Sequence, residues 1–166
     1  MAVIVMGVSG SGKTTLGTAL AKRLGVSFIE GDSLHPPENI AKMSAGIALT
    51  DDDRWPWLAN ISQALSNNGG SVGSCSALKR IYRDRLRSGI GPELRFLCLM
   101  VPRTELERRM AERRGHFMPP GLLDSQLATF EPPVDEADAL LVDGTLPPET
   151  NAERVVAWLN SGLSPN

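Results

Sequence analysis

The most informative stretch of the chain reads Gly7-Val8-Ser9-Gly10-Ser11-Gly12-Lys13-Thr14. It matches the pattern G-x-x-x-x-G-K-[S/T] at every fixed position. The residues just before it, 2–6, are all apolar, as expected for a strand buried on both faces. The residues after it place Leu16, Leu20 and Leu24 at four-residue spacing, followed by Gly25, which is typical of an amphipathic helix and its end. The sequence therefore predicts a strand, a glycine-rich loop and a helix, in that order.

Each residue type in this loop suits the binding of a polyphosphate. Glycines let backbone N–H groups curve closely around phosphate oxygens, and the N-terminus of the following helix adds its dipole. Lys13 offers a positive charge to the β- and γ-phosphates, and the Thr14 hydroxyl is a candidate Mg²⁺ ligand. We predict that all eight residues bind ATP, with Lys13 also catalytic and Mg²⁺ as cofactor. A glycine-rich turn that merely precedes a lysine is the alternative interpretation.

Length and composition limit the class of protein. The chain has 166 residues, 42% of them hydrophobic and 22% charged, and its formal net charge is -2. These values predict one globular domain over residues 1–166 and disfavour nucleic-acid or membrane-surface partners, which usually bind basic proteins. The two cysteines form no CxxC pair, and no apolar run approaches the length of a membrane span. We expect a cytoplasmic protein.

Strands are predicted to alternate with helices along the chain, which indicates a three-layer α/β fold with a parallel sheet between helices. A capping box, Thr104 to Glu107, is predicted to start one of the helices. The motifs D-x-x-G and N-K-x-D of GTPases are absent, so the length favours a small-molecule kinase. The expected strands are residues 2–6, 27–30, 69–75, 94–101 and 139–142, and the expected helices are residues 13–24, 37–44, 55–66, 78–87, 104–114, 122–129 and 148–159.

An acidic residue follows the second predicted strand, in Glu30-Gly31-Asp32. The carboxyl end of a parallel strand lies beside the phosphate loop, where ligands bind. A carboxylate there can orient an attacking hydroxyl, accept its proton or hold Mg²⁺ through water. We predict this catalytic and substrate-binding role for Asp32; a local turn cap is the alternative. The third strand ends in Ser74-Cys75-Ser76 without an acidic residue, which leaves the role to Asp32.

Four further residues are candidates for the acceptor substrate. His35 is either a structural hydrogen bonder or a contact for substrate hydroxyls. Arg54 follows three aspartates that suit a helix start, and it offers a fixed cation to an acidic substrate. Lys79 and Arg83 lie four residues apart and share one helix face, whereas Arg80 and Arg87 share another. We predict that His35, Arg54, Lys79 and Arg83 bind substrate.

Arginines near the end of the predicted helix 104–114 suggest a mobile lid. Arg109 and Arg113 lie four residues apart, just before a loop bounded by glycine and proline. A cationic loop that closes over the transferring phosphate also excludes water. The alternative is that these cations only complement the helix dipole. We predict that Arg109 and Arg113 belong to the lid and that Arg113 is catalytic.

Several stretches together resemble the bacterial-type gluconokinases. The resemblance implies transfer of the γ-phosphate of ATP to the 6-hydroxyl of D-gluconate, with Mg²⁺, by a homodimer of nucleoside-monophosphate-kinase-like fold. It also implies a lid over residues 113–126, in which His116 is a substrate-binding residue. The matching stretches are residues 7–14, 31–36, 39–43, 49–58, 75–84, 113–117 and 125–126.

One segment departs from that family, because residues 70–74 read Gly-Ser-Val-Gly-Ser where an aliphatic strand is usual. We expect weaker packing there, with the catalytic stretches intact. Two alternative functions stay open. A shikimate-kinase-like enzyme would show Asp-x-Asp after the second strand and Gly-Gly-Gly after the third, whereas the chain has Glu30-Gly31-Asp32 and Cys75-Ser76-Ala77. A non-catalytic nucleotide-binding regulator is the other.

Overall fold

The computed structural model describes residues 1–67, 69–113 and 120–162. Its centre is a five-stranded sheet in the order β2-β3-β1-β4-β5, in which every neighbouring pair is parallel. The predicted α/β fold is confirmed. The strands are β1 (Ala2–Met6), β2 (Ser27–Ile29), β3 (Ser71–Ser74), β4 (Leu94–Met100) and β5 (Ala139–Asp143).

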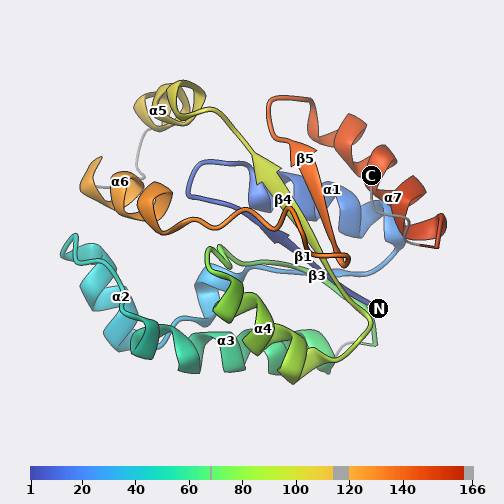
Figure 1. Cartoon of the computed structure of the whole chain (residues 1–166), viewed down its shortest axis with the longest axis horizontal. Coiled ribbons are helices and arrows are strands. Elements are labelled where there is room, and N and C mark those ends of the chain that lie inside the picture. The colour runs from blue at the N-terminus through green and yellow to red at the C-terminus, as the bar shows by residue number, and fades with distance from the viewer. Residues whose placement is uncertain (68, 114–119, 163–166) are drawn as a thin grey trace.

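Helices cover both faces of the sheet (Figure 1). Val3 and Val5 of β1 face a core cluster that includes side chains of α1 and α7, whereas Ile4 and Met6 face a cluster with side chains of α3 and α4. This alternation follows from the two-residue repeat of a strand and explains why β1 is apolar throughout. The helical elements are α1 (Lys13–Leu24), the 3-10 helix η1 (Gly31–Leu34), α2 (Pro37–Ser44), α3 (Asp51–Ser66), α4 (Arg80–Ile90), α5 (Arg103–Glu112), α6 (Pro120–Thr129) and α7 (Pro148–Asn160). None of the helices within the described residues has the length and apolar character to cross a membrane.

Small residues in β3 and η1 permit neighbouring elements to approach β3 closely. All four residues of β3 are buried. A Cβ atom on Gly31 would lie 1.9 Å from the Ser74 carbonyl oxygen, and one on Gly73 would lie 3.0 Å from Leu65 Cδ2. The missing side chains of Gly31 and Gly73 therefore let η1 and α3 pack directly against the strand, where larger side chains would hold them away.

Four helices, α3 to α6, begin at other residues than the sequence-based expectation gave, and the starts of α3 and α5 have a reason in their caps. Helix α3 begins at Asp51 rather than at residue 55, because the Thr50 side chain and Asp53 form a capping box there. The capping box predicted at Thr104 is wrong: α5 begins at Arg103 after Pro102, without a side-chain cap. Pro102 has an extended backbone that ends the preceding segment, so Thr104 already lies inside the first turn.

Candidate active site

The phosphate loop joins β1 to α1 as predicted. Gly7, Gly10 and Gly12 have φ values of 143°, 81° and 98°, which side chains with a Cβ atom rarely adopt. The Ser11 N–H donates to the Val8 carbonyl at 3.2 Å, and Lys13 Nζ donates to the same oxygen at 3.0 Å. The loop is therefore curved with its lysine folded back over it. This arrangement can surround an anion with backbone N–H groups at a helix N-terminus.

The structure places Asp32 within electrostatic range of Lys13. Burial lowers the pKa of Lys13, and the nearby carboxylates of Asp32 and Glu30 oppose this shift. Loss of water raises the pKa of Asp32, while the charge of Lys13 works in the opposite direction. Asp32 lies on η1 and its side chain still reaches solvent, so a substrate can approach it. An acid with a raised pKa next to a lysine suits proton transfer at the phosphate loop.

Glu30 is a candidate site residue that sequence reasoning did not select. Its Oε2 accepts a hydrogen bond from Thr14 Oγ1 at 2.5 Å, and its Oε1 accepts one from Ser74 Oγ at 2.5 Å. The carboxylate thus joins the phosphate loop to the end of β3, where the sequence lacks an acid. Its position at the end of β2, two residues before Asp32, is the signal that could have identified it.

The oxygen groups at this position fit Mg²⁺. This ion prefers oxygen ligands and commonly uses one or two carboxylates together with phosphate oxygens and water. Thr14, Glu30 and Asp32 supply a hydroxyl and two carboxylates near the phosphate loop. Among the described residues, no group of three or more His, Cys, Asp or Glu side chains is placed to hold a metal ion. A metal here would therefore depend on the nucleotide for part of its coordination.

His35 is held firmly at the edge of the acceptor side. Its ring stacks on Trp57 with centroids 4.1 Å apart, and Asn39 Nδ2 lies 3.2 Å from His35 Nδ1. An amide nitrogen can only donate, so Nδ1 is the acceptor and the proton belongs on Nε2. Burial and then the charge of Arg54 lower the pKa of His35 to about 4. His35 is therefore neutral at pH 7, with a donor at Nε2. This state is compatible with a structural hydrogen bonder and with a contact for substrate hydroxyls.

We expect His35 to make the protein less stable as the pH falls from about 6.5 to about 4. In that window the unfolded chain takes up a proton that the folded chain refuses, because the pKa of His35 is about 4 in the fold. The effect amounts to at most about 3 kcal/mol. Urea unfolding across this pH range should give a smaller pH slope for His35→Gln than for the natural chain. Equal slopes would contradict this prediction.

Arg54 and Lys79 gather around Tyr82. The Arg54 guanidinium carbon lies 5.2 Å and Lys79 Nζ lies 5.6 Å from the ring centroid, both over the ring. Lys79 Nζ also donates to Asp51 Oδ1 at 3.0 Å, and the Tyr82 hydroxyl donates to the same oxygen. Arg54 Nε is buried and has no hydrogen-bond partner among the described residues. An unpaired buried donor on a cation suits an anionic ligand.

Arg83 does not take part in this group, which corrects the expectation that it binds substrate. Its side chain is only 1% exposed and forms an ion pair with Glu136. Its remaining donors reach the carbonyl oxygens of Ala77 and Leu78. The predicted division of faces is wrong, because Arg83 and Arg87 both contact Glu136, whereas Lys79 is the N-cap of α4 and contacts Asp51. The helix spacing could not show that the face with Arg83 packs against the segment after α6.

Arg109 connects the phosphate loop to the end of the sheet. Its Nη1 donates to the carbonyl oxygens of Gly10 and Ser11 at 3.2 Å, and its Nη2 donates to that of Gly144 at 2.6 Å. Arg109 and the exposed Arg113 both line a cavity of about 330 Å³ beside the loop. The cavity is large enough for a flat base next to bound phosphates, so both arginines stand where a nucleotide would lie.

The predicted lid is described only in part. Residues 114–119, and with them His116, lie outside the described residues. Residues 120–126 belong to α6, and Figure 1 shows α6 on the same side of the sheet as α5. Gln126 Oε1 accepts a hydrogen bond from the Ser9 N–H at 2.7 Å. Helix α6 therefore contacts the phosphate loop directly, a contact between residues 117 positions apart that sequence patterns do not reveal.

The parallel sheet, the phosphate loop and the facing Lys13 and Asp32 define a nucleotide-dependent kinase of the phosphate-loop class. Residues 3–133 match the family described as AAA domain. The chain is 48% identical to the gluconokinase of Gluconobacter oxydans, over 93% of this chain and 88% of that one, and 44% identical to the thermoresistant gluconokinase of Escherichia coli, over 96% and 93%. The chain belongs to the gluconokinase family.

Solved structures agree with this assignment. A gluconokinase from Sinorhizobium meliloti is 51% identical and superposes with a TM-score of 0.88, covering 95% of this chain and 90% of that one. A shikimate kinase from Aquifex aeolicus superposes with a TM-score of 0.58 at 18% identity, which shows a shared fold alone. The alternative of a shikimate-kinase-like enzyme is therefore not favoured.

Proposed function

We propose that this chain transfers the γ-phosphate of ATP to the 6-hydroxyl of D-gluconate, giving 6-phospho-D-gluconate and ADP. The observation that carries the proposal is that Asp32 lies within electrostatic range of Lys13 of the phosphate loop, in a chain of the gluconokinase family. The unpaired Nε of Arg54 supports an acceptor that carries a negative charge, such as the carboxylate of a sugar acid.

The residues divide the work between the two substrates. The loop N–H groups and Lys13 bind the phosphates and stabilise the negative charge that develops during transfer. Asp32 orients the attacking hydroxyl and accepts its proton. Arg54 and Lys79 bind the carboxylate end of the acceptor, and His35 donates from Nε2 to a hydroxyl. Arg113 supplies positive charge from the lid side, with His116 as a further acceptor contact.

We propose Thr14 as the protein ligand of Mg²⁺, with Glu30 and Asp32 receiving its bound water molecules. When bound, the ion neutralises phosphate charge and fixes the orientation of the nucleotide. The hydrogen bond from Thr14 to Glu30 supports this assignment, because it already places a carboxylate beside the hydroxyl.

A coupled assay that follows ADP formation tests the proposed function. Purified protein with MgATP is offered gluconate, shikimate and nucleoside monophosphates in parallel, and phosphorus NMR identifies the product. We expect turnover with gluconate alone and a phosphate monoester at its 6-position. ATP binding without turnover on gluconate would instead support the non-catalytic regulator, and turnover on shikimate would support the other alternative.

We also propose a cytoplasmic homodimer in which residues 1–166 form a single domain. The family resemblance supports the dimer, and the ordinary composition with two cysteines supports a reducing compartment. Light scattering coupled to size-exclusion chromatography would show twice the mass of one chain for the dimer.

A further inference from the structure

Arg83 and Glu136 form a buried ion pair away from the reacting groups. The side chain of Arg83 is 1% exposed and that of Glu136 is 5% exposed. Arg83 Nε lies 2.9 Å from Glu136 Oε2 and its Nη2 lies 2.5 Å from Oε1, so the contact is a two-pronged fork. Burial of two charges is costly unless their geometry is good and their other polar atoms are satisfied. Stability alone is therefore a weak reason for a buried ion pair at this position, which favours a role in function.

The third nitrogen of the Arg83 guanidinium, Nη1, contacts a strained part of the backbone. Its Nη1 donates to the Ala77 carbonyl at 2.9 Å and to the Leu78 carbonyl at 3.3 Å. Ala77 has a φ of 44°, in the left-handed region that residues with a Cβ atom rarely occupy. Such a conformation persists only when the surroundings impose it, and strain of this kind is common at functional sites. Arg83 is the side chain that contacts the strained residue's carbonyl.

The loop held in this way, residues 75–79, touches both halves of the active site. The Gly7 N–H of the phosphate loop donates to the Ser76 carbonyl at 3.3 Å. At its other end the loop presents Lys79, which contacts Asp51 and the ring of Tyr82 beside Arg54. A shift of this loop therefore moves the cation group relative to the phosphates.

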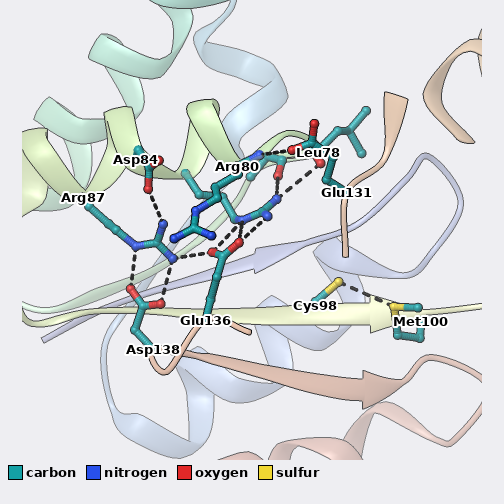
Figure 2. Close-up of polar contacts among 11 residues, drawn as sticks. Leu78, Arg80, Asp84, Arg87, Cys98, Met100, Glu131, Glu136 and Asp138 are labelled. Atoms are coloured by element: carbon teal, nitrogen blue, oxygen red, sulfur yellow. Dashed lines mark hydrogen bonds and ion pairs between the residues drawn. The ribbon is translucent and has the colours of Figure 1, made fainter. Parts of the chain in front are cut away.

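Glu136, the acidic partner in the pair, belongs to the segment after α6, and Figure 2 shows the polar contacts of this segment with α4 and the residues before it. The Glu131 N–H donates to the Leu78 carbonyl at 2.8 Å, and the Glu131 carboxylate accepts from the Arg80 N–H at 2.7 Å. Glu136 is also held by Arg87 Nη2 at 2.5 Å. Hydrogen bonds thus hold residues 131–136 in place, and Arg83 connects this segment to the strained loop.

We propose that Arg83, supported by Glu136, is a positioning residue that fixes the 75–79 loop so that Lys79 and Arg54 meet the carboxylate of the acceptor. The inference rests on the proposed function. It differs from a direct substrate contact, because Nε, Nη1 and Nη2 of Arg83 all donate to protein oxygens. Loss of the Arg83 contacts should weaken acceptor binding while nucleotide binding at the far side of the loop persists.

The test replaces the pair by Arg83→Met with Glu136→Leu, since buried ion pairs often tolerate apolar residues of similar size. We expect the KM for gluconate to rise about tenfold, because two hydrogen bonds from a charged donor are lost, and the KM for ATP to change by less than about twofold. Arg83→Lys should give a similar split, since an ammonium cannot form the fork. Adding Ala77→Gly, which accepts the left-handed backbone without strain, should recover part of the gluconate KM.

Arg23→Met is the matched control, because Arg23 pairs with Glu149 and Glu153 of α7 rather than with the 75–79 loop or Glu136. It should leave both KM values unchanged, and circular dichroism with thermal melts confirms that each variant is folded. A folded double variant with an unchanged gluconate KM would overturn the inference, as would an equal rise in the Arg23→Met variant. Failure of the natural chain to phosphorylate gluconate would instead overturn the proposed function.

Discussion

Lys13→Met is expected to lower kcat by about a thousandfold, the loss typical of removing a preorganised group that stabilises charge in the transition state. It should also weaken ATP binding. The ammonium lies in a partly dry site, where burial lowers its pKa and the charges of Asp32 and Glu30 oppose this shift. Charges act more strongly there than in water. Methionine keeps the unbranched apolar part of the lysine side chain and removes the ammonium group with its charge and donors.

Steady-state kinetics and calorimetry with a non-hydrolysable ATP analogue measure both effects. Lys22→Met is the control, because Lys22 lies on the same helix and is exposed to solvent. It should behave as the natural chain does. Ordinary kinetics in the Lys13 variant would show that the phosphate loop has been wrongly assigned.

Asp32→Asn is expected to reduce kcat by about a hundredfold or more, the range for a positioned general base, with nucleotide affinity retained. Asparagine has nearly the same shape but accepts no proton. Because loss of water raises the pKa of Asp32, the natural enzyme should lose activity on acidification at a higher pH than an ordinary aspartate would cause. The carboxylate is the active form, so kcat rises with pH through this pKa and the variant lacks that rise.

The measurement is a pH profile of kcat for both proteins together with their ATP affinities. Asp135→Asn, at an exposed position in the segment after α6, serves as a control for the substitution itself. Were Asp32→Asn to turn over at the natural rate, the base would have to be another group, and Glu30 would be the next candidate because of its contact with Thr14.

The sheet, the phosphate loop and the location of Asp32 near Lys13 could be predicted from residues close together in the chain. An apolar strand buried on both faces, glycines at left-handed positions and leucines at helical spacing are local features, and each restricts the backbone by itself. Parallel strands then bring their carboxyl ends to one edge of the sheet. This is why the sequence alone predicts that Asp32, which lies in η1 after β2, is close to the phosphate loop.

Only the tertiary structure decided which polar side chains bind to one another. Arg83 binds Glu136, which lies 53 positions away, and Ser9 binds Gln126, which lies 117 positions away. Glu30 joins Thr14 and Ser74 across three different elements. A charged residue on a helix has several possible partners, and the choice depends on which distant segment packs against that face. Hydrophobic pattern and turn chemistry act within a few residues, whereas hydrogen bonds across the fold form between groups that only the completed packing brings into contact.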